Sequence, residues 1–489
     1  MSPTYEAEKA RYQEYTSTAA TGRQGKQEEV RTSPLFSLAV KHTPTDIKNE
    51  DLPKRTNQRT IKIEMADEQR SLVLPQYALL GHHVGEDNTI GDNEPILLNV
   101  NAPSSAFICG SQGSGKSYTL ASMLENVLLP TDILGKVSQP VAGVVFHYAV
   151  DSASSIAEAT YLCSRGIKVN VVVSPSNAAA LTGAYRSIDK AGKLTVKPLL
   201  LHSSDLSIER MHKLMAIAEK EGPMPLYMEV VQRILREMAM KNTFSYYNFK
   251  AKLTQEKLTK DQTGPMNLRL GLLESFMAPQ DTCALRNQTH ATRKKKTLFD
   301  LSPGSLTIID LSDTFIDSST VCTLFDICLG IIKEQRPPSG LALCIDEAHK
   351  YMNKSAAADA FTERLLTTIR EQRHNAARVI IATQEPTISE RLLDLCSISI
   401  VHRFTSPAWF IAIKDHLSGA SKLVTSAEEQ HAMFERIVDL DVGESLVFSP
   451  SSFVGRENGQ VRKLGAVAMK MMSRKRLGED GGMSVLASR

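Results

Sequence analysis

The chain has 489 residues, of which 42% are hydrophobic and 23% are charged, close to ordinary globular usage. This length predicts two or three structural units. The formal net charge of +3 neither requires nor excludes a nucleic-acid partner, because a binding channel needs only local positive charge. The seven cysteines are scattered without paired spacing, which argues against a disulfide framework or a zinc site.

Targeting and membrane signals are missing from the sequence. The first residues, MSPTYEAEKA, form no apolar stretch that could serve as a signal peptide. No run approaches the roughly 18 consecutive apolar residues that a transmembrane helix needs. We therefore expect an intracellular protein of the cytoplasm or nucleus that is not secreted and has no membrane partner.

The first half of the chain predicts a polar tail followed by an α/β unit. Residues 1–70 are rich in polar and charged side chains, which predicts a disordered tail. Strand, helix and strand then alternate through residues 71–204, which is typical of a mostly parallel sheet. The expected strands are 71–80, 95–100, 104–110, 141–148 and 168–173, and the expected helices are 116–128 and 156–163.

The second half interrupts this rhythm and then resumes it. Residues 205–297 predict a helical insertion, with periodic apolar residues at 207–221, 226–240, 246–258 and 266–276, followed by a polar, basic loop. Residues 298–470 predict the second part of the α/β core, and residues 471–489 a disordered tail. Here the expected strands are 305–310, 341–345, 378–383 and 398–403, and the expected helices are 320–334 and 357–372.

A phosphate-binding motif begins at the glycine that ends the expected strand 104–110. Its residues match GxxxxGK followed by Ser or Thr: Gly110, Ser111, Gln112, Gly113, Ser114, Gly115, Lys116 and Ser117. Glycines let the backbone curl so that N–H groups face a phosphate, and the following helix adds its positive end. Lys116 can reach the β and γ phosphates of ATP, Ser117 can ligate Mg²⁺, and Tyr118 adjoins them.

An apolar strand ending in two carboxylates predicts the catalytic side of the site. After LALCI, Asp346 can hold the Mg²⁺ shell through water, and Glu347 can act as the general base for the attacking water. Asp310 also ends a strand, as either a second acidic ligand or a capping residue. Gln384 ends a further strand, where it either orients water or makes a turn. Arg373 belongs either to a solvated helix end or to an arginine finger.

Taken in order, these motifs resemble the HerA–FtsK superfamily of P-loop motor ATPases, and HerA-type ATPases most of all. The similar segments run from about residue 81 to about residue 467. They are GHHVG, LLNVNAPSSAFICGSQGSGKS, LSPGSLTIIDLSD, LALCIDEAHKYM, REQRHNAARVIIATQEP, SISIVHRFTS and VGESLVFSP. The sequence departs from the family at Glu385, where arginine is common, and at Ala376, where glycine is usual. The N-terminal β-barrel of many HerA proteins is not evident in residues 1–80.

The resemblance implies a RecA-like core, a hexameric ring with ATP and Mg²⁺ between subunits, and translocation or unwinding of double-stranded DNA. It implies that Gln384 is a sensor, that Arg373 acts on the neighbouring subunit's nucleotide, and that Arg403 is a second candidate at the subunit boundary. A nuclease or another protein partner, and a substrate that is protein instead of DNA, stay open, as does a non-hydrolysing scaffold. The basic residues Arg286 and Arg293–Lys296 either line the ring's pore or form a solvated loop.

Overall fold

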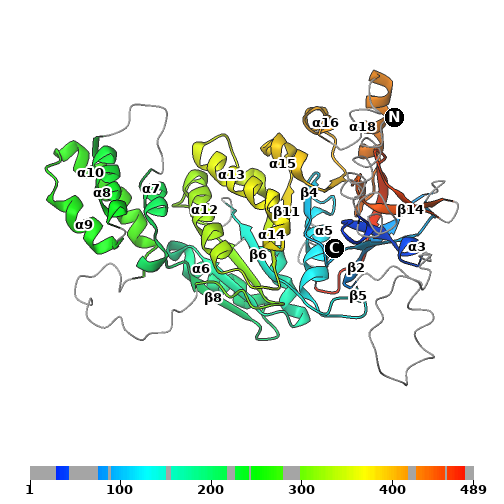
Figure 1. Cartoon of the computed structure of the whole chain (residues 1–489), viewed down its shortest axis with the longest axis horizontal. Coiled ribbons are helices and arrows are strands. Elements are labelled where there is room, and N and C mark those ends of the chain that lie inside the picture. Colours follow the sequence, from blue (N-terminus) through cyan, green and yellow to red (C-terminus); the bar gives the residue numbers. More distant parts are fainter. Residues whose placement is uncertain are drawn as a thin grey trace, which may run out of the picture.

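A computed structural model of the chain describes residues 29–42, 75–85, 90–149, 156–216, 226–241, 244–278, 298–416, 426–457 and 460–479. The strands of these residues form one 16-stranded sheet. The helical insertion lies at one end of the molecule and the β14 region at the other, with the parallel part of the sheet between them (Figure 1).

The parallel part of the sheet carries the sequence motifs. Its strand order is β12-β4-β11-β10-β6-β9-β7-β8, and each neighbouring pair is parallel. These strands are β4 (Ser105–Cys109), β6 (Ala142–His147), β7 (Val169–Val173), β8 (Leu194–Pro198), β9 (Leu306–Asp310), β10 (Leu341–Ile345), β11 (Ala377–Thr383) and β12 (Ile398–His402). The predicted α/β class with a mostly parallel sheet is confirmed.

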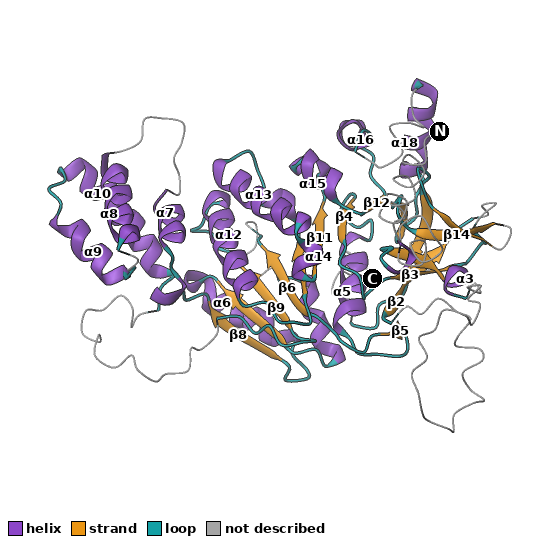
Figure 2. Ribbon diagram, viewed as in Figure 1, coloured by secondary structure: helices purple, strands orange, loops and turns teal. Residues whose placement is uncertain are grey.

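Helices cover both faces of this sheet (Figure 2), because the strands are apolar on both faces. On β6, Val144 and Phe146 belong to one core and Val145 to the other, as the two-residue period of a strand requires. The first core holds α12 (Ser318–Glu334) and α13 (Ala356–Arg370). The second holds α5 (Lys116–Leu128), η1 (Glu158–Arg165) and α6 (Ala178–Ile188).

Mostly antiparallel strands extend the sheet beyond β12, and only β1 and β14 among these described strands pair in parallel. Their order is β15-β14-β1-β3-β2-β16-β13, and the short β5 pairs with β2. The bounds are β1 (Leu35–Ser37), β2 (Tyr77–His83), β3 (Pro95–Leu98), β5 (Gly135–Lys136), β13 (Glu444–Phe448), β14 (Phe453–Glu457), β15 (Gln460–Lys463) and β16 (Met469–Ser473).

Two segments predicted as disordered tails are partly ordered. Within residues 1–70, β1 pairs with β3 and β14, and Leu35 and Phe36 are buried. The polar composition of the wider segment concealed this short apolar run. Within residues 471–489, β16 continues to Ser473, and Arg474 is buried against α5. The prediction of disorder is therefore wrong for residues 29–42 and 471–479.

The described part of the predicted helical insertion contains four helices, α7 (Ile208–Ala216), α8 (Leu226–Met240), α9 (Tyr246–Gln255) and α10 (Lys260–Ser275). The remaining short helices are α3 (Leu38–Lys41), η2 (Pro175–Asn177), η3 (Ser203–Asp205), η5 (Ala348–Lys350), α14 (Gln372–Asn375), η6 (Pro386–Ile388), α15 (Glu390–Leu395), α16 (Pro407–Lys414) and α18 (Ala427–Val438). In the described part of the chain, no helix combines the length and the apolar character needed to cross a bilayer.

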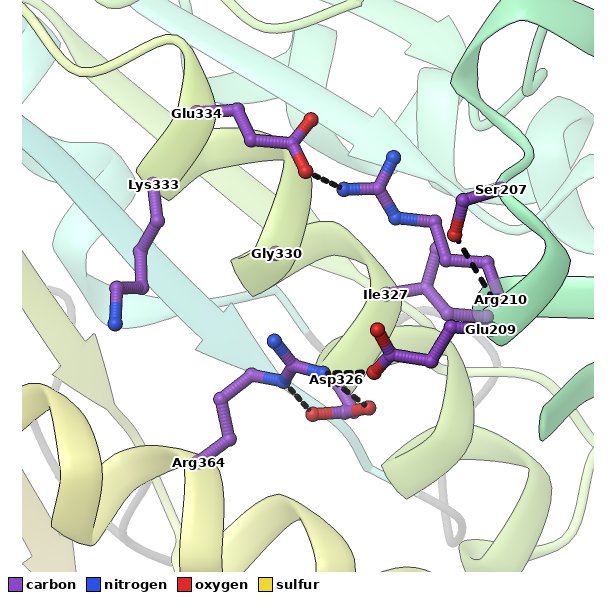
Figure 3. Close-up of a pocket in the computed structure, with 9 residues that line it drawn as sticks. All are labelled: Ser207, Glu209, Arg210, Asp326, Ile327, Gly330, Lys333, Glu334 and Arg364. Atoms are coloured by element: carbon purple, nitrogen blue, oxygen red, sulfur yellow. Dashed lines mark hydrogen bonds and ion pairs between the residues drawn. The ribbon is translucent and has the colours of Figure 1, made fainter. Parts of the chain in front are cut away.

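Ion pairs join the insertion to the core in a small cavity of about 220 Å³ between α7, α12 and α13 (Figure 3). We call this cavity the joint. The buried Asp326 of α12 binds Lys213 of α7 at 2.7 Å and also binds Arg364 of α13. Arg210 pairs with Glu334 across the same cavity. Because these partners come from three helices, the joint fixes the insertion to one face of the sheet.

Candidate nucleotide site

The phosphate loop connects β4 to α5 through a tightly curled backbone. Gly110 has a φ of 153° and Gly115 a φ of 106°. A β-carbon at Gly110 would lie 2.7 Å from Cβ of His402, and one at Gly115 would lie 3.1 Å from the backbone of Gly443. Only glycine meets both the conformation and the close approach. The sequence motif therefore requires its glycines for a measurable steric reason.

Neighbouring strand ends hold the loop on two sides. The carbonyl oxygen of Arg403 accepts hydrogen bonds from the N–H and the Oγ of Ser111, both at 2.9 Å. The N–H of Gly443 donates to the carbonyl of Ser114 at 3.2 Å. The loop shape is thus fixed by residues more than 280 positions away in sequence. The first N–H groups of α5, including those of Lys116 and Ser117, have no carbonyl partner within the helix.

Lys116 is buried at the base of this loop. Its Nζ donates to the carbonyl of Ser111 at 2.9 Å. Burial lowers the pKa of Lys116, and the nearby negative charges of Glu347 and Asp346 act in the opposite direction. That electrostatic effect indicates that the phosphate loop and the acidic strand end face the same space. The ammonium has no carboxylate partner among the described residues.

The acidic pair lies two strands from the loop, with β11 between them. Asp346 follows β10 directly, and Glu347 has a left-handed φ of 48°, an unusual conformation for a residue other than glycine. From the end of β11, the amide Nε2 of Gln384 donates to Oε1 of Glu347 at 3.2 Å. The three predicted residues Lys116, Glu347 and Gln384 therefore meet at one edge of the sheet.

The second carboxylate oxygen of Glu347 is available for a proton. Its Oε2 is buried and accepts no hydrogen bond from the described residues, although Nδ1 of His349 lies 3.3 Å away. That ring nitrogen faces the backbone N–H of Gln384 at 3.4 Å, so it is an acceptor and has no proton for Glu347. Burial lowers the pKa of His349, which favours this neutral form. A buried oxygen without a donor is suited to a general base.

Asp346 is paired with a histidine that the sequence did not single out. Nδ1 of His147, at the end of β6, lies 3.2 Å from Oδ2 of Asp346, and both side chains are buried. Burial acts to lower the pKa of His147, but the hydrogen bond with Asp346 and the charges of Asp310 and Asp346 raise it overall. Tyr351 donates to the carbonyl of Asp346 at 3.2 Å. These contacts fix the orientation of the Asp346 carboxylate.

The residues predicted to hold Mg²⁺ fit a hard cation in their chemistry, because Ser117 and Asp346 both offer oxygen. Ser117 lines the cavity beside the phosphate loop. Asp346 is not among the residues that line this cavity, which is compatible with binding of the metal through water. The described residues contain no cluster of three or more His, Cys, Asp or Glu side chains that could hold a metal alone. Here the remaining ligands would come from phosphate oxygens and water.

A cavity of about 590 Å³ lies between the phosphate loop and the acidic strand end. Its lining includes acid, amide and lysine side chains together with a tyrosine, a valine and a methionine. The lining residues are Gln112, Gly113, Gly115, Lys116, Ser117, Tyr118, Glu158, Glu347, Lys350, Gln384, Val442, Gly443, Met472 and Ser473. The cavity size and this polarity suit a nucleoside triphosphate.

The C-terminal segment forms part of the cavity lining. Met472 and Ser473 of β16 line the cavity, and the following residues cross α5. The N–H of Arg476 donates to the hydroxyl of Tyr118 at 2.7 Å, and its guanidinium lies 5.4 Å from that ring's centre. Arg474 binds the fully buried Glu125 of α5 at 2.8 Å. Two ionic and aromatic contacts therefore anchor this segment beside the phosphate-loop helix.

Three other predicted residues lie outside the cavity of their own chain. Arg373 is exposed on α14, before the amino end of β11, whereas Gln384 follows the carboxyl end of that strand. Seven strand residues separate the two positions by roughly 23 Å. Arg403 contacts the phosphate loop through its backbone. The Asp310 carboxylate accepts hydrogen bonds from Tyr185 and from the N–H of Ser312, which supports the capping role.

Prediction and structure cover different residues in two places. The basic candidates Arg286 and Arg293–Lys296 lie outside the described residues. Sequence reasoning missed the cavity-lining residues Lys350, Val442 and Met472. For Lys350, the position directly after the acidic motif was a usable signal. Val442 and Met472 reach the site only through the pairing of β13 with β12 and β16, which no local pattern reveals.

Comparisons with known proteins agree with this architecture. No family model and no curated protein sequence matches the chain. Among solved structures, VirB4 of Thermoanaerobacter pseudethanolicus is similar with a TM-score of 0.50 and 11% identity, covering 82% of this chain and 97% of VirB4. The cytoplasmic domain of the type VII secretion ATPase EccC of Thermomonospora curvata covers 82% of this chain and 29% of its own, with 11% identity and a TM-score of 0.31.

The genome-packaging NTPase B204 of Sulfolobus turreted icosahedral virus 2, in complex with sulfate, is also similar. It shows 10% identity and a TM-score of 0.28, and the match covers 71% of this chain and 92% of B204. At these identities the likeness concerns the fold, and the VirB4 match carries it. Together with the loop and strand order described above, it establishes that the chain has the RecA-like P-loop ATPase fold.

Proposed function

We propose that the chain is an ATP-hydrolysing motor that works as a ring and translocates or unwinds double-stranded DNA. One observation carries the ATPase proposal: the phosphate loop, Glu347 and Gln384 surround a single cavity. The choice of duplex DNA rests on the resemblance of the ordered motifs to HerA-type ATPases.

The residues around the cavity have different proposed roles during ATP hydrolysis. The triphosphate would lie beside the phosphate loop, with the α5 N-terminus and Lys116 against its phosphates. Mg²⁺ bound by Ser117 and, through water, by Asp346 would neutralise phosphate charge. A water oxygen attacks the γ phosphorus and gives its proton to the carboxylate of Glu347. The bond between that phosphorus and the bridging oxygen breaks, which leaves ADP and inorganic phosphate.

Gln384 and the apolar lining residues complete the proposed site. The Gln384 amide donates to Oε1 of Glu347 and so holds the carboxylate of the general base. The nucleoside would lie toward Tyr118, Val442 and Met472, whose apolar surfaces can cover a base. Because no arginine lines the cavity in the described part of the chain, Arg373 or Arg403 of a neighbouring subunit would supply one in a hexamer.

ATP turnover measured with and without duplex DNA tests the proposal. A DNA motor predicts stimulation by duplex DNA that weakens as salt is added, because phosphate contacts release counterions. If duplex DNA leaves the rate unchanged and a protein substrate raises it, the chain moves protein. If purified oligomer binds ATP without turning it over in either condition, it is a nucleotide-dependent scaffold.

A further inference from the structure

The lining of the nucleotide cavity contains a second lysine besides Lys116. Lys350 closes the short helix η5, three residues after Glu347, and its side chain lines the cavity together with Lys116, Glu347 and Gln384. The N–H of Lys350 donates to the carbonyl of Glu347 at 2.9 Å. The left-handed turn at Glu347 thus determines where both the general base and this lysine lie.

The ammonium group of Lys350 forms no ion pair with a carboxylate of the described residues. Among the described residues, no ion pair involves its ammonium, whereas the lysines and arginines of the joint are paired. Burial is the main cause that lowers the pKa of His349, and the positive charge of Lys350 adds to it. The same charge opposes the raised pKa of His147. Lys350 therefore acts electrostatically on both histidines that flank the acidic pair.

An unpaired ammonium at this position matches the chemistry of γ-phosphate transfer. Negative charge on the γ-phosphate oxygens has to be stabilised as the bond to ADP breaks. Lys116 comes from the phosphate loop, where its Nζ donates to the Ser111 carbonyl, whereas Lys350 follows Glu347 at the acidic strand end. A cation that follows Glu347 approaches the terminal phosphate from the side of the attacking water.

We propose that Lys350 is a second phosphate-binding catalytic residue, which contacts the γ-phosphate from the same chain that supplies Lys116 and Glu347. This inference rests on the proposed ATPase function and adds a cis-acting cation to it. It predicts discrimination between ATP and ADP, because only ATP carries the phosphate that Lys350 contacts.

The test compares full-length wild-type protein with Lys350→Ala, Lys350→Met and Lys350→Arg. Lys354→Ala is the matched control, since Lys354 is an exposed lysine four residues further along that does not line the cavity. Turnover is measured as kcat and KM, and binding with fluorescent ATP and ADP analogues. Lys350→Ala should reduce kcat roughly 100-fold, as the loss of one transition-state contact does. It should weaken ATP binding while ADP binding changes less than about 2-fold.

The other variants separate a phosphate contact from a structural role. Lys350→Arg should restore part of kcat, and Lys354→Ala should match wild type. If Lys350→Ala disturbs folding, Lys350→Met keeps the aliphatic stem and gives the decisive values. A kcat and an ATP-to-ADP affinity ratio equal to wild type in Lys350→Met would overturn the inference while ATP turnover by wild type keeps the proposed function. A wild-type protein that binds no ATP would instead refute the proposed function itself.

Discussion

Two cavities of this molecule are lined by charged residues, and they differ in how those charges are satisfied. In the joint, Lys213, Arg210 and Arg364 each bind a carboxylate of a neighbouring helix. In the nucleotide cavity, Lys116 and Lys350 have no carboxylate partner among the residues that the structure describes. Paired charges connect secondary structure elements, whereas the unpaired lysines of the nucleotide cavity can bind an anionic ligand.

Backbone conformation separates the two regions in the same way. At the nucleotide cavity Glu347, a residue other than glycine, has a left-handed conformation that costs conformational energy. The joint is built on the regular helices α7, α12 and α13. Strain at the nucleotide cavity and regular structure at the joint indicate a chemical role for the first and a mechanical role for the second.

The largest expected effect comes from removing the general base. Glu347→Gln should reduce ATP turnover by up to about 10⁴-fold, because the amide cannot accept the proton of the attacking water. ATP should still bind, since the phosphate loop is intact. Steady-state hydrolysis and equilibrium nucleotide binding measure the two effects separately. Glu363→Gln, an exposed carboxylate on α13, is the control and should turn over like wild type; equal turnover in Glu347→Gln would refute the assignment of the base.

The next effect concerns the missing arginine of the nucleotide cavity. Arg373→Ala should slow hydrolysis about 10³-fold without abolishing ATP binding, as the loss of an arginine finger does. Because Arg373 lies far from its own cavity, mixing this variant with Lys116→Ala subunits should restore part of the turnover. An unmixed Arg373→Ala protein with normal turnover rules this residue out as the finger.

The joint should respond in stability and not in chemistry. Asp326→Ala leaves Lys213 and Arg364 without their buried partner and should lower the free energy of unfolding by about 3 kcal/mol. Denaturant unfolding measures this change. Glu334→Gln, which alters a largely exposed partner in the same cavity, should change stability by less than about 0.5 kcal/mol. Equal effects of the two substitutions would remove the distinction between buried and exposed pairs.

Low pH should lower the free energy of unfolding through protonation of His402, which lies beside the phosphate loop. Burial lowers the pKa of this histidine to about 4, while its Nδ1–H donates to the carbonyl of Glu444 and its Nε2 accepts from Thr119. His402 binds a proton more readily in the unfolded chain than in the folded protein. The neutral histidine's contribution to the free energy of unfolding is therefore complete above about pH 6.5 and is lost as the pH falls toward 4. The loss should reach about 3 kcal/mol over that interval. His402→Gln should reduce the pH dependence of unfolding; an unchanged slope contradicts the account.

The smallest expected effect lies at the family departure Ala376. This residue has a left-handed φ of 47°, which explains why glycine is usual at the position. Ala376→Gly should raise the free energy of unfolding by roughly 0.5 kcal/mol and leave turnover unchanged. Ala382→Gly, in the buried strand β11, is the control and should destabilise the protein. A loss of stability in Ala376→Gly would show that other contacts of the methyl group dominate.

Local sequence patterns predicted the parts of the site that are local in sequence. The phosphate loop, the acidic pair and Gln384 each follow a short apolar strand, and parallel strands bring their carboxyl ends to one edge. The helices 116–128 and 226–240 were predicted with the observed bounds. Burial of Leu35 and Phe36 was not predicted, because it depends on β3 and β14, which are distant in sequence.

The rest of the site depends on pairings that leave no local pattern. His402 and Gly443 shape the phosphate loop through β12 and β13, and Met472 reaches the cavity through β16. His147 meets Asp346 because β6 and β10 pair in register. A single sequence contains no signal for such registers, so these residues became visible only in the folded structure.

Equilibrium binding of a fluorescent ATP analogue tests most directly which cavity is the nucleotide site. The measurement compares wild type with Lys116→Ala in the nucleotide cavity and Lys333→Ala in the joint. We predict that Lys116→Ala abolishes or strongly weakens binding, whereas Lys333→Ala binds like wild type. Undiminished binding by Lys116→Ala, or loss of binding in Lys333→Ala alone, would contradict the assignment.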